Sequence, residues 1–193
     1  GGTDCFSDAY IDKMKTLHDT LIKTESRVGY SFALEGDSKC QIKREDLWKC
    51  NIRRSGAFFQ AVGILISKLN LGKDVSILEP GCGTGYLTEI LAKIGCKVDS
   101  VDVSERYCQV GRDRSQYTTH RDDLVAVYHA DIESYLNQCE KKYDVILFFE
   151  SFHHIMNHYR VLEKIVQDHL SPNWKIVLAA ESIYADREVG EYI

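Results

Sequence analysis

Three glycines on alternate positions form the first pattern in the sequence that suggests binding chemistry. In the stretch "VSILEPGCGTG" an apolar run ends at Glu79, and Gly81, Gly83 and Gly85 follow. Glycine has no Cβ, so it adopts positive φ angles and lets a ligand approach the main chain. A helical pattern begins directly afterwards, and the N-terminus of a helix adds unpaired N–H groups. We call residues 81–85 the glycine loop.

The spacing of these glycines and the acid before them indicate which ligand the loop binds. A dinucleotide-binding loop reads G-x-G-x-x-G, but the position of its third glycine is Tyr86 here. Glu79 would repel a pyrophosphate, whereas it suits a ligand that carries an ammonium or a sulfonium group. The sequence therefore favours S-adenosylmethionine over NAD. A tight strand–helix turn without a ligand is the structural alternative.

A second group of candidate residues lies in "FFESFHHIMNHY", which includes Glu150, His153, His154 and His158. Histidine titrates near neutral pH, so His153 or His154 is a candidate catalytic base for a hydroxyl acceptor. The alternative is that one ring is packed and hydrogen-bonded while the other lines the site passively. Cysteine or carboxylate ligands at the spacing of a zinc site do not accompany them, so we expect no metal.

Two arginines before an amphipathic helix are candidates for the carboxylate of the methionine moiety. Arg53 and Arg54 precede this helix, and a guanidinium can bind a carboxylate in bidentate fashion; ordinary surface charge is the alternative. Aromatic residues further upstream either form a lid over the substrate or pack in a core: Tyr30, Phe32 and Trp48.

The elements that position these residues follow an alternating pattern. Apolar runs predict strands at 75–79, 97–101, 124–128, 143–149 and 175–180. Helical patterns lie at 8–24, 55–69, 85–94, 105–115 and 158–170, and Ser55 is the expected N-cap of the second of these helices. We expect both prolines to lie in turns. Alternating strands and helices predict an α/β fold with a three-layer, doubly wound parallel sheet. We expect a helical and irregular extension at 1–54 and a ligand-binding domain at 55–193.

The motif "ILEPGCGTG" resembles the first motif of the class I S-adenosylmethionine-dependent methyltransferases, and the resemblance extends from about Val75 to Glu181. Asp102 stands at the end of the second predicted strand, 17 residues after Gly85. This spacing is close to that at which an acid binds ribose hydroxyls in Rossmann-like domains. The resemblance implies that role for Asp102, and it implies that Asp131 and the backbone of Ile132 contact the adenine. Asp102 as a turn residue and Asp131 as a helix cap are the alternatives. We assign Glu79 and Glu150 to the same cofactor site.

The resemblance also limits the reaction. The site lacks the two prolines that follow the acidic or amide residue in amino methyltransferases, and it lacks the Pro-Cys pair of cytosine-5 methyltransferases. The "FHHI" pattern resembles small-molecule methyltransferases. We therefore expect methyl transfer to a small molecule at a hydroxyl oxygen. A protein or RNA methyltransferase and a non-catalytic module that binds S-adenosylmethionine are the alternatives.

The family fold has two more strands than the sequence predicts, because only residues 182–193 follow the fifth strand. Either the chain is part of a longer protein, or another segment covers the sheet edge. An exposed edge strand favours association. We therefore expect the N-terminal segment, the last residues or a second subunit of a homodimer to cover it.

The composition of the chain indicates which partners and which cellular compartment to expect. The chain has 193 residues and a net charge of −5, which argues against non-specific binding to nucleic acid. Its seven scattered cysteines contain no C-x-x-C pair, and we interpret them as reduced thiols of a cytoplasmic protein. The sequence contains no apolar run of the length that a membrane span needs.

Overall fold

A parallel sheet of five strands forms the centre of the computed structural model, which describes residues 7–13, 16, 52–119 and 123–181. All neighbouring strands are parallel, in the order β3-β2-β1-β4-β5. The strands are β1 (Ser76–Pro80), β2 (Lys97–Asp102), β3 (Val125–His129), β4 (Tyr143–Phe149) and β5 (Leu170–Ala179). The order reverses between β1 and β4, and such a switch point is where doubly wound sheets bind ligands. The predicted fold class is confirmed.

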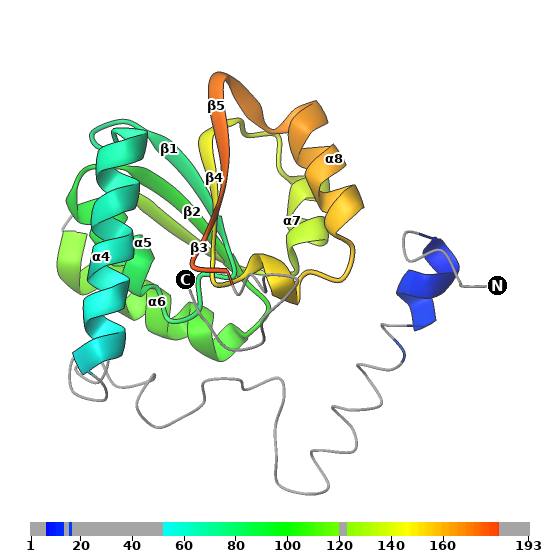
Figure 1. Ribbon diagram of the computed structural model, residues 1–193, viewed down its shortest axis with the longest axis horizontal. Coiled ribbons are helices and arrows are strands. Elements are labelled where there is room, and N and C mark those ends of the chain that lie inside the picture. Colours follow the sequence, from blue (N-terminus) through cyan, green and yellow to red (C-terminus); the bar gives the residue numbers. More distant parts are fainter. Residues whose placement is uncertain (1–6, 14–15, 17–51, 120–122, 182–193) are drawn as a thin grey trace, which may run out of the picture.

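Helices cover both faces of the sheet (Figure 1). One layer contains α4 (Ile52–Leu69), α5 (Tyr86–Lys93) and α6 (Glu105–Thr119), and the other contains α7 (Ile132–Gln138) and α8 (His158–Asp168). Strand β4 shows why the sequence "VILF" is apolar throughout. Val145 and Leu147 pack in the core under α4 and α5, whereas Ile146 and Phe148 pack in the core under α7 and α8. A strand that is buried on both faces needs no polar alternation.

Three boundaries differ from the sequence prediction. Helix α4 begins at Ile52, so Ser55 is a buried residue of its first turns and not its cap. The expected boundary between 54 and 55 therefore falls inside this helix. Strand β5 begins at Leu170 and includes Pro172, which we had placed in a turn. The pairing of β4 with β5 shifts register between Tyr143 and Val145, and an irregular edge strand tolerates a proline.

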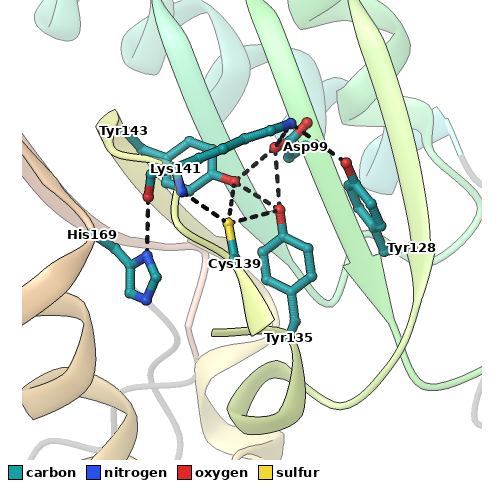
Figure 2. A network of polar contacts seen from close by, with 7 residues as sticks. All are labelled: Asp99, Tyr128, Tyr135, Cys139, Lys141, Tyr143 and His169. Carbon is teal, nitrogen blue, oxygen red and sulfur yellow. Dashed lines mark hydrogen bonds and ion pairs between the residues drawn. The ribbon is translucent and has the colours of Figure 1, made fainter. Parts of the chain in front are cut away.

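A polar network joins β2, α7 and the start of β4 (Figure 2). One carboxylate oxygen of Asp99 lies 2.7 Å from the Tyr143 hydroxyl, 3.1 Å from the Tyr135 hydroxyl and 2.7 Å from Nζ of Lys141. The two hydroxyls are themselves 2.7 Å apart, and Cys139 lies beside both. Burial is the main cause that raises the pKa of both tyrosines. Both phenols therefore remain protonated and stabilise the buried carboxylate.

Two further findings concern the periphery. Residues 8–13 are helical, in agreement with the described part of the helix expected at 8–24. Across the described ranges, none of the helices combines the length and apolar character that crossing a membrane requires.

Candidate active site

The glycine loop has the left-handed backbone that its sequence predicts. Gly81, Gly83 and Gly85 have φ angles of 73°, 53° and 76°, a region that other residues adopt only at a cost. The loop is attached to the end of β2, because the N–H of Gly81 donates to the carbonyl of Val101 at 2.7 Å. A Cβ on Gly85 would lie 3.1 Å from the Cα of Gly111 on α6. The third glycine therefore permits close contact between the loop and α6.

Asp102, the last residue of β2, lies directly beside the loop. Its Oδ2 accepts from the N–H of Gly83 at 2.9 Å, and its Oδ1 accepts from the N–H of Ser104 at 2.8 Å. Burial raises the pKa of Asp102, and these two N–H groups act in the opposite direction. Each carboxylate oxygen has two lone pairs, so a carboxylate with one bond per oxygen retains acceptor capacity for a ligand. The Asp102 side chain thus holds the glycine loop by a hydrogen bond and can still accept hydrogen bonds from a ligand.

Glu79 lies in β1, two residues before the first glycine of the loop, and is 3% exposed. Its Oε2 accepts from the hydroxyl of Thr88 on α5 at 2.6 Å and from the hydroxyl of Ser100 on β2 at 3.2 Å. Burial raises the pKa of Glu79 to about 7, although both hydroxyls lower it. Because of this environment, the charge of Glu79 changes near neutral pH. The site therefore contains an acid whose negative charge a nearby cation would stabilise.

Ser151 joins the glycine loop to the segment that follows β4. Its hydroxyl donates to the carbonyl of Pro80 at 2.7 Å. A Cβ on Gly81 would lie 2.6 Å from the Cβ of Ser151, so only glycine allows this approach. Ser151 begins a short turn, η2 (Phe152–His154), which contains two of the candidate histidines. The loop and the histidines are therefore parts of one packed site.

The three candidate histidines after β4 have different surroundings. Nδ1 of His153 lies 2.6 Å from Oε2 of Glu181, the residue that follows Ala180 after β5. The ring of His154 lies 4.0 Å from the ring of His153, measured between centroids. Nε2 of His158 lies 3.1 Å from the carbonyl of Phe152. Of the two candidate bases, the structure places His153 against a carboxylate.

Three of the remaining predicted site residues lie at or just after the carboxyl ends of strands, and the fourth, Arg54, lies in α4. Asp131 is the N-cap of α7 and accepts from the N–H of Ser134 at 2.9 Å, which is the alternative that the sequence left open. Ile132 begins that helix and packs against the core. Glu150 follows β4 with a φ of 51°, and its N–H donates to the carbonyl of Ala179. Arg54 is in the first turn of α4, and its side chain lies outside the described part of the structure.

Comparison with models of known protein families identifies the family to which this fold belongs. The family is described as a methyltransferase domain, and it matches residues 78–173, from β1 into β5. This part of the chain belongs to the class I S-adenosylmethionine-dependent methyltransferases.

Individual methyltransferases agree with this assignment. The chain is 33% identical over 112 residues to malonyl-(acyl-carrier protein) O-methyltransferase of Bacillus cereus, a match that covers 57% of this chain and 39% of that protein. It is 26% identical over 138 residues to a ubiquinone biosynthesis O-methyltransferase of Serratia proteamaculans, covering 72% and 51%.

A solved structure, coclaurine N-methyltransferase bound to N-methylheliamine and SAH, superposes with a TM-score of 0.56 at 26% identity, covering 77% of this chain and 40% of that one. The chain spans about half the length, or less, of the curated relatives that it matches.

Arg114 contacts the glycine loop, a position that the sequence did not predict. It lies on α6 with a side chain that is 4% exposed, and its Nε donates to the carbonyl of Thr84 within the glycine loop at 3.0 Å. Nη1 lies 3.2 Å from Glu89, and the guanidinium lies 3.7 Å from the centre of the Tyr86 ring. Arg114 therefore fixes the loop to the start of α5. A basic residue within a helix gives no sequence signal for this role.

Glu181 is a second residue of the site that is absent from the sequence prediction. Its Oε1 accepts from the N–H groups of Ser151 and Phe152 at 2.9 and 2.8 Å. One signal was present, because the carboxyl ends of adjacent parallel strands meet at the same edge. An acid directly after β5 could therefore have been expected beside the residues that follow β4. Among the described residues, no group of three or more His, Cys, Asp or Glu side chains could hold a metal ion.

Proposed function

We propose that this chain binds S-adenosylmethionine and transfers its methyl group to a hydroxyl oxygen of a small molecule. The observation that carries the proposal is the contact of Ser151 with Pro80 and Gly81. Through it, the turn that holds His153 is packed directly against the glycine loop. A cofactor at the loop would thus have a candidate base beside it.

The residues present fit this cofactor. The glycines expose the main chain, and Asp102 has acceptor capacity for the ribose hydroxyls. Asp131 and Ile132 are assigned to the adenine, and a carboxylate matches its donor amine. Glu79 would stabilise the positive charge of the ligand, and Glu150 and Arg54 complete the assigned set.

The cofactor supplies an activated methyl group on a sulfonium. The protein then needs to align the acceptor and to take its proton. Alignment of two reactants can contribute on the order of 7–11 kcal/mol, and a positioned base typically adds 10²–10⁴-fold. His153 is the first candidate for the base, and His154, in ring contact with it, is the second.

The names of the relatives support the acceptor class. Two are O-methyltransferases, of malonyl-(acyl-carrier protein) and of ubiquinone biosynthesis, which supports an oxygen acceptor. The structural relative is an N-methyltransferase, so an amine nitrogen is the second candidate acceptor atom.

Turnover with methyl-labelled S-adenosylmethionine tests the proposal. Cell-extract fractions serve as acceptors, each also treated with protease or ribonuclease, and we expect label in a product that survives both treatments. Loss of labelling after protease or ribonuclease would instead indicate a protein or RNA acceptor. Tight binding of S-adenosylhomocysteine without any turnover would indicate a non-catalytic binding module.

A further inference from the structure

The carboxylate of Glu181, two residues after the end of β5, accepts hydrogen bonds from the turn that follows β4. Oε1 accepts from the N–H groups of Ser151 and Phe152, and Oε2 lies 3.4 Å from the N–H of His153. Oε2 also lies 2.6 Å from Nδ1 of the same residue. The Glu181 side chain is 10% exposed, whereas that of His153 is 45% exposed. The carboxylate is thus largely buried, whereas the ring that contacts it is half exposed.

The charge of Glu181 decides which nitrogen of His153 carries the proton. Burial raises the pKa of Glu181, but the hydrogen bonds from His153 and the three N–H groups outweigh this effect and lower it. Glu181 is therefore ionised at neutral pH, and an ionised carboxylate only accepts hydrogen bonds. Nδ1 must then be the donor, so in the neutral ring the lone pair is on Nε2.

We propose that Glu181 is a positioning residue that holds His153 in its Nδ1–H tautomer and so makes Nε2 the atom that takes the acceptor's proton. The inference deepens the proposed function and rests on it. In the reaction, an oxygen–carbon bond forms while the sulfur–carbon bond breaks and its electron pair remains on sulfur. The hydroxyl proton passes to Nε2, and the imidazolium later releases it to water.

The carboxylate contact distinguishes His153 from His158, whose Nε2 faces the carbonyl of Phe152. The ring of His154 lies 4.0 Å from the ring of His153, measured between centroids. An ionised carboxylate beside Nδ1 also stabilises the imidazolium that forms when Nε2 accepts a proton. The contact with Glu181 therefore favours His153 as the base.

The variant Glu181→Gln separates the tautomer from the packing. Its amide oxygen can still accept from Ser151 and Phe152, while its NH₂ group would face Nδ1. A donor at that position favours the Nε2–H tautomer, which removes the lone pair from Nε2. The matched control is Glu163→Gln, an exposed glutamate on α8.

Nitrogen-15 NMR of imidazole-labelled protein, at a pH where the ring is neutral, reads the tautomer without any substrate. The signal of His153 is assigned by its loss in His153→Gln. We expect Nδ1–H in the unchanged chain and in Glu163→Gln, and Nε2–H in Glu181→Gln. An Nε2–H ring in the unchanged chain, or the same tautomer in Glu181→Gln, would overturn the proposal. The tautomer of the unchanged chain tests the proposal even if Glu181→Gln does not fold.

Methyl transfer to the most active extract fraction gives the second readout. In serine hydrolases, exchange of the carboxylate partner of a catalytic histidine for an amide costs about 10⁴-fold. We expect Glu181→Gln to lose on the order of 10²–10⁴-fold in transfer rate while it binds S-adenosylhomocysteine within about twofold of the unchanged chain. Unchanged transfer in this variant would overturn the role of Glu181. If the unchanged chain transfers no methyl group at all, the proposed function fails, and the NMR result alone decides the tautomer.

Discussion

The Cβ of Ser151 occupies the space that a side chain on Gly81 would need, because a Cβ built there lies 2.6 Å from it. Gly81 also has a φ of 73°, so two independent constraints require glycine at this position. The contact lies between the cofactor loop and the histidine turn. A change at Gly81 should therefore affect both binding and catalysis.

The variant Gly81→Ala tests this contact. We expect a stability loss of at least about 1–2 kcal/mol from the left-handed backbone, a further loss from the clash, and weaker binding of S-adenosylhomocysteine by calorimetry. The double variant Gly81→Ala/Ser151→Gly should recover part of the lost stability and part of the lost affinity, because it removes the clash. The control is Gly63→Ala in α4, where an added Cβ would meet no atom within 4 Å apart from its chain neighbours and the backbone of its own helix. This change should stabilise the helix by about 0.5–1 kcal/mol. Equal effects of the two alanine variants would refute the steric argument.

Glu79→Gln should change stability in a pH-dependent way. The pKa of Glu79 is raised from 4.5 to about 7, so between these values the folded chain holds a proton that the unfolded chain releases. Stability due to this group is therefore complete below pH 4.5 and falls as the pH rises towards 7, by roughly 3 kcal/mol in total. We expect Glu79→Gln to be more stable than the unchanged chain at pH 8 and similar at pH 4.5.

Urea unfolding at both pH values measures this difference, with Glu163→Gln as the control for the loss of a carboxylate. The same variant should bind S-adenosylmethionine more weakly at pH 8, because it lacks the negative charge near the cationic ligand. A Gln variant that is less stable at pH 8 would contradict the argument from burial.

Asp102→Ala should weaken the binding of S-adenosylhomocysteine by roughly 1.5–3 kcal/mol, the range for hydrogen bonds to a charged group. The variant also loses the acceptor for the Gly83 N–H, so the loop itself becomes less ordered. Asp168→Ala, at the end of α8, is the control. Calorimetry that finds the two variants equal would leave Asp102 as a turn residue only.

Tyr143→Phe should destabilise the chain without changing cofactor binding. It removes the hydroxyl that donates to Asp99 at 2.7 Å, and weakening a buried carboxylate network in this way costs about 1–3 kcal/mol. Tyr143 begins β4, at the opposite end of the strand from the histidine turn. The control is Tyr128→Phe, whose hydroxyl accepts from Lys141 at 3.4 Å, and it should cost less. Urea unfolding compares the two variants, and equal losses would show that the network contributes little.

The sequence predicted those features that depend on neighbouring residues. Alternate glycines predicted the left-handed loop, and the apolar run at 143–149 predicted a doubly buried strand. The order of the strands indicates that Glu181 lies near the residues that follow β4, but neither its bond to His153 nor the contact of Arg114 with Thr84 could be predicted from neighbouring residues. Glu181 is separated from His153 by 28 positions, and Arg114 from Thr84 by 30, so only the fold brings them together. Pro172 was placed in a turn because a proline usually breaks a strand, but an edge strand with a register shift accommodates it.

The exposed edge of the sheet leads to the last prediction. Strand β5 lies at the sheet edge beside β4, as the sequence predicts, and the side chains of Trp174 and Leu178 are about half exposed in the described structure. Unpaired N–H and C=O groups on an apolar edge strand form a template for pairing. We expect a partner strand to protect this edge, either from the N-terminal segment, from the range 182–193, which the structure does not describe, or from a second subunit. Hydrogen exchange should therefore be slow at amides of 176–180 that point away from β4.

Dilution distinguishes protection by the same chain from protection by a second subunit. Protection within one chain is independent of concentration, whereas protection in a homodimer is lost as the dimer dissociates. Fast exchange at these amides, in a chain that stays monomeric at high concentration, would show that the edge is uncovered.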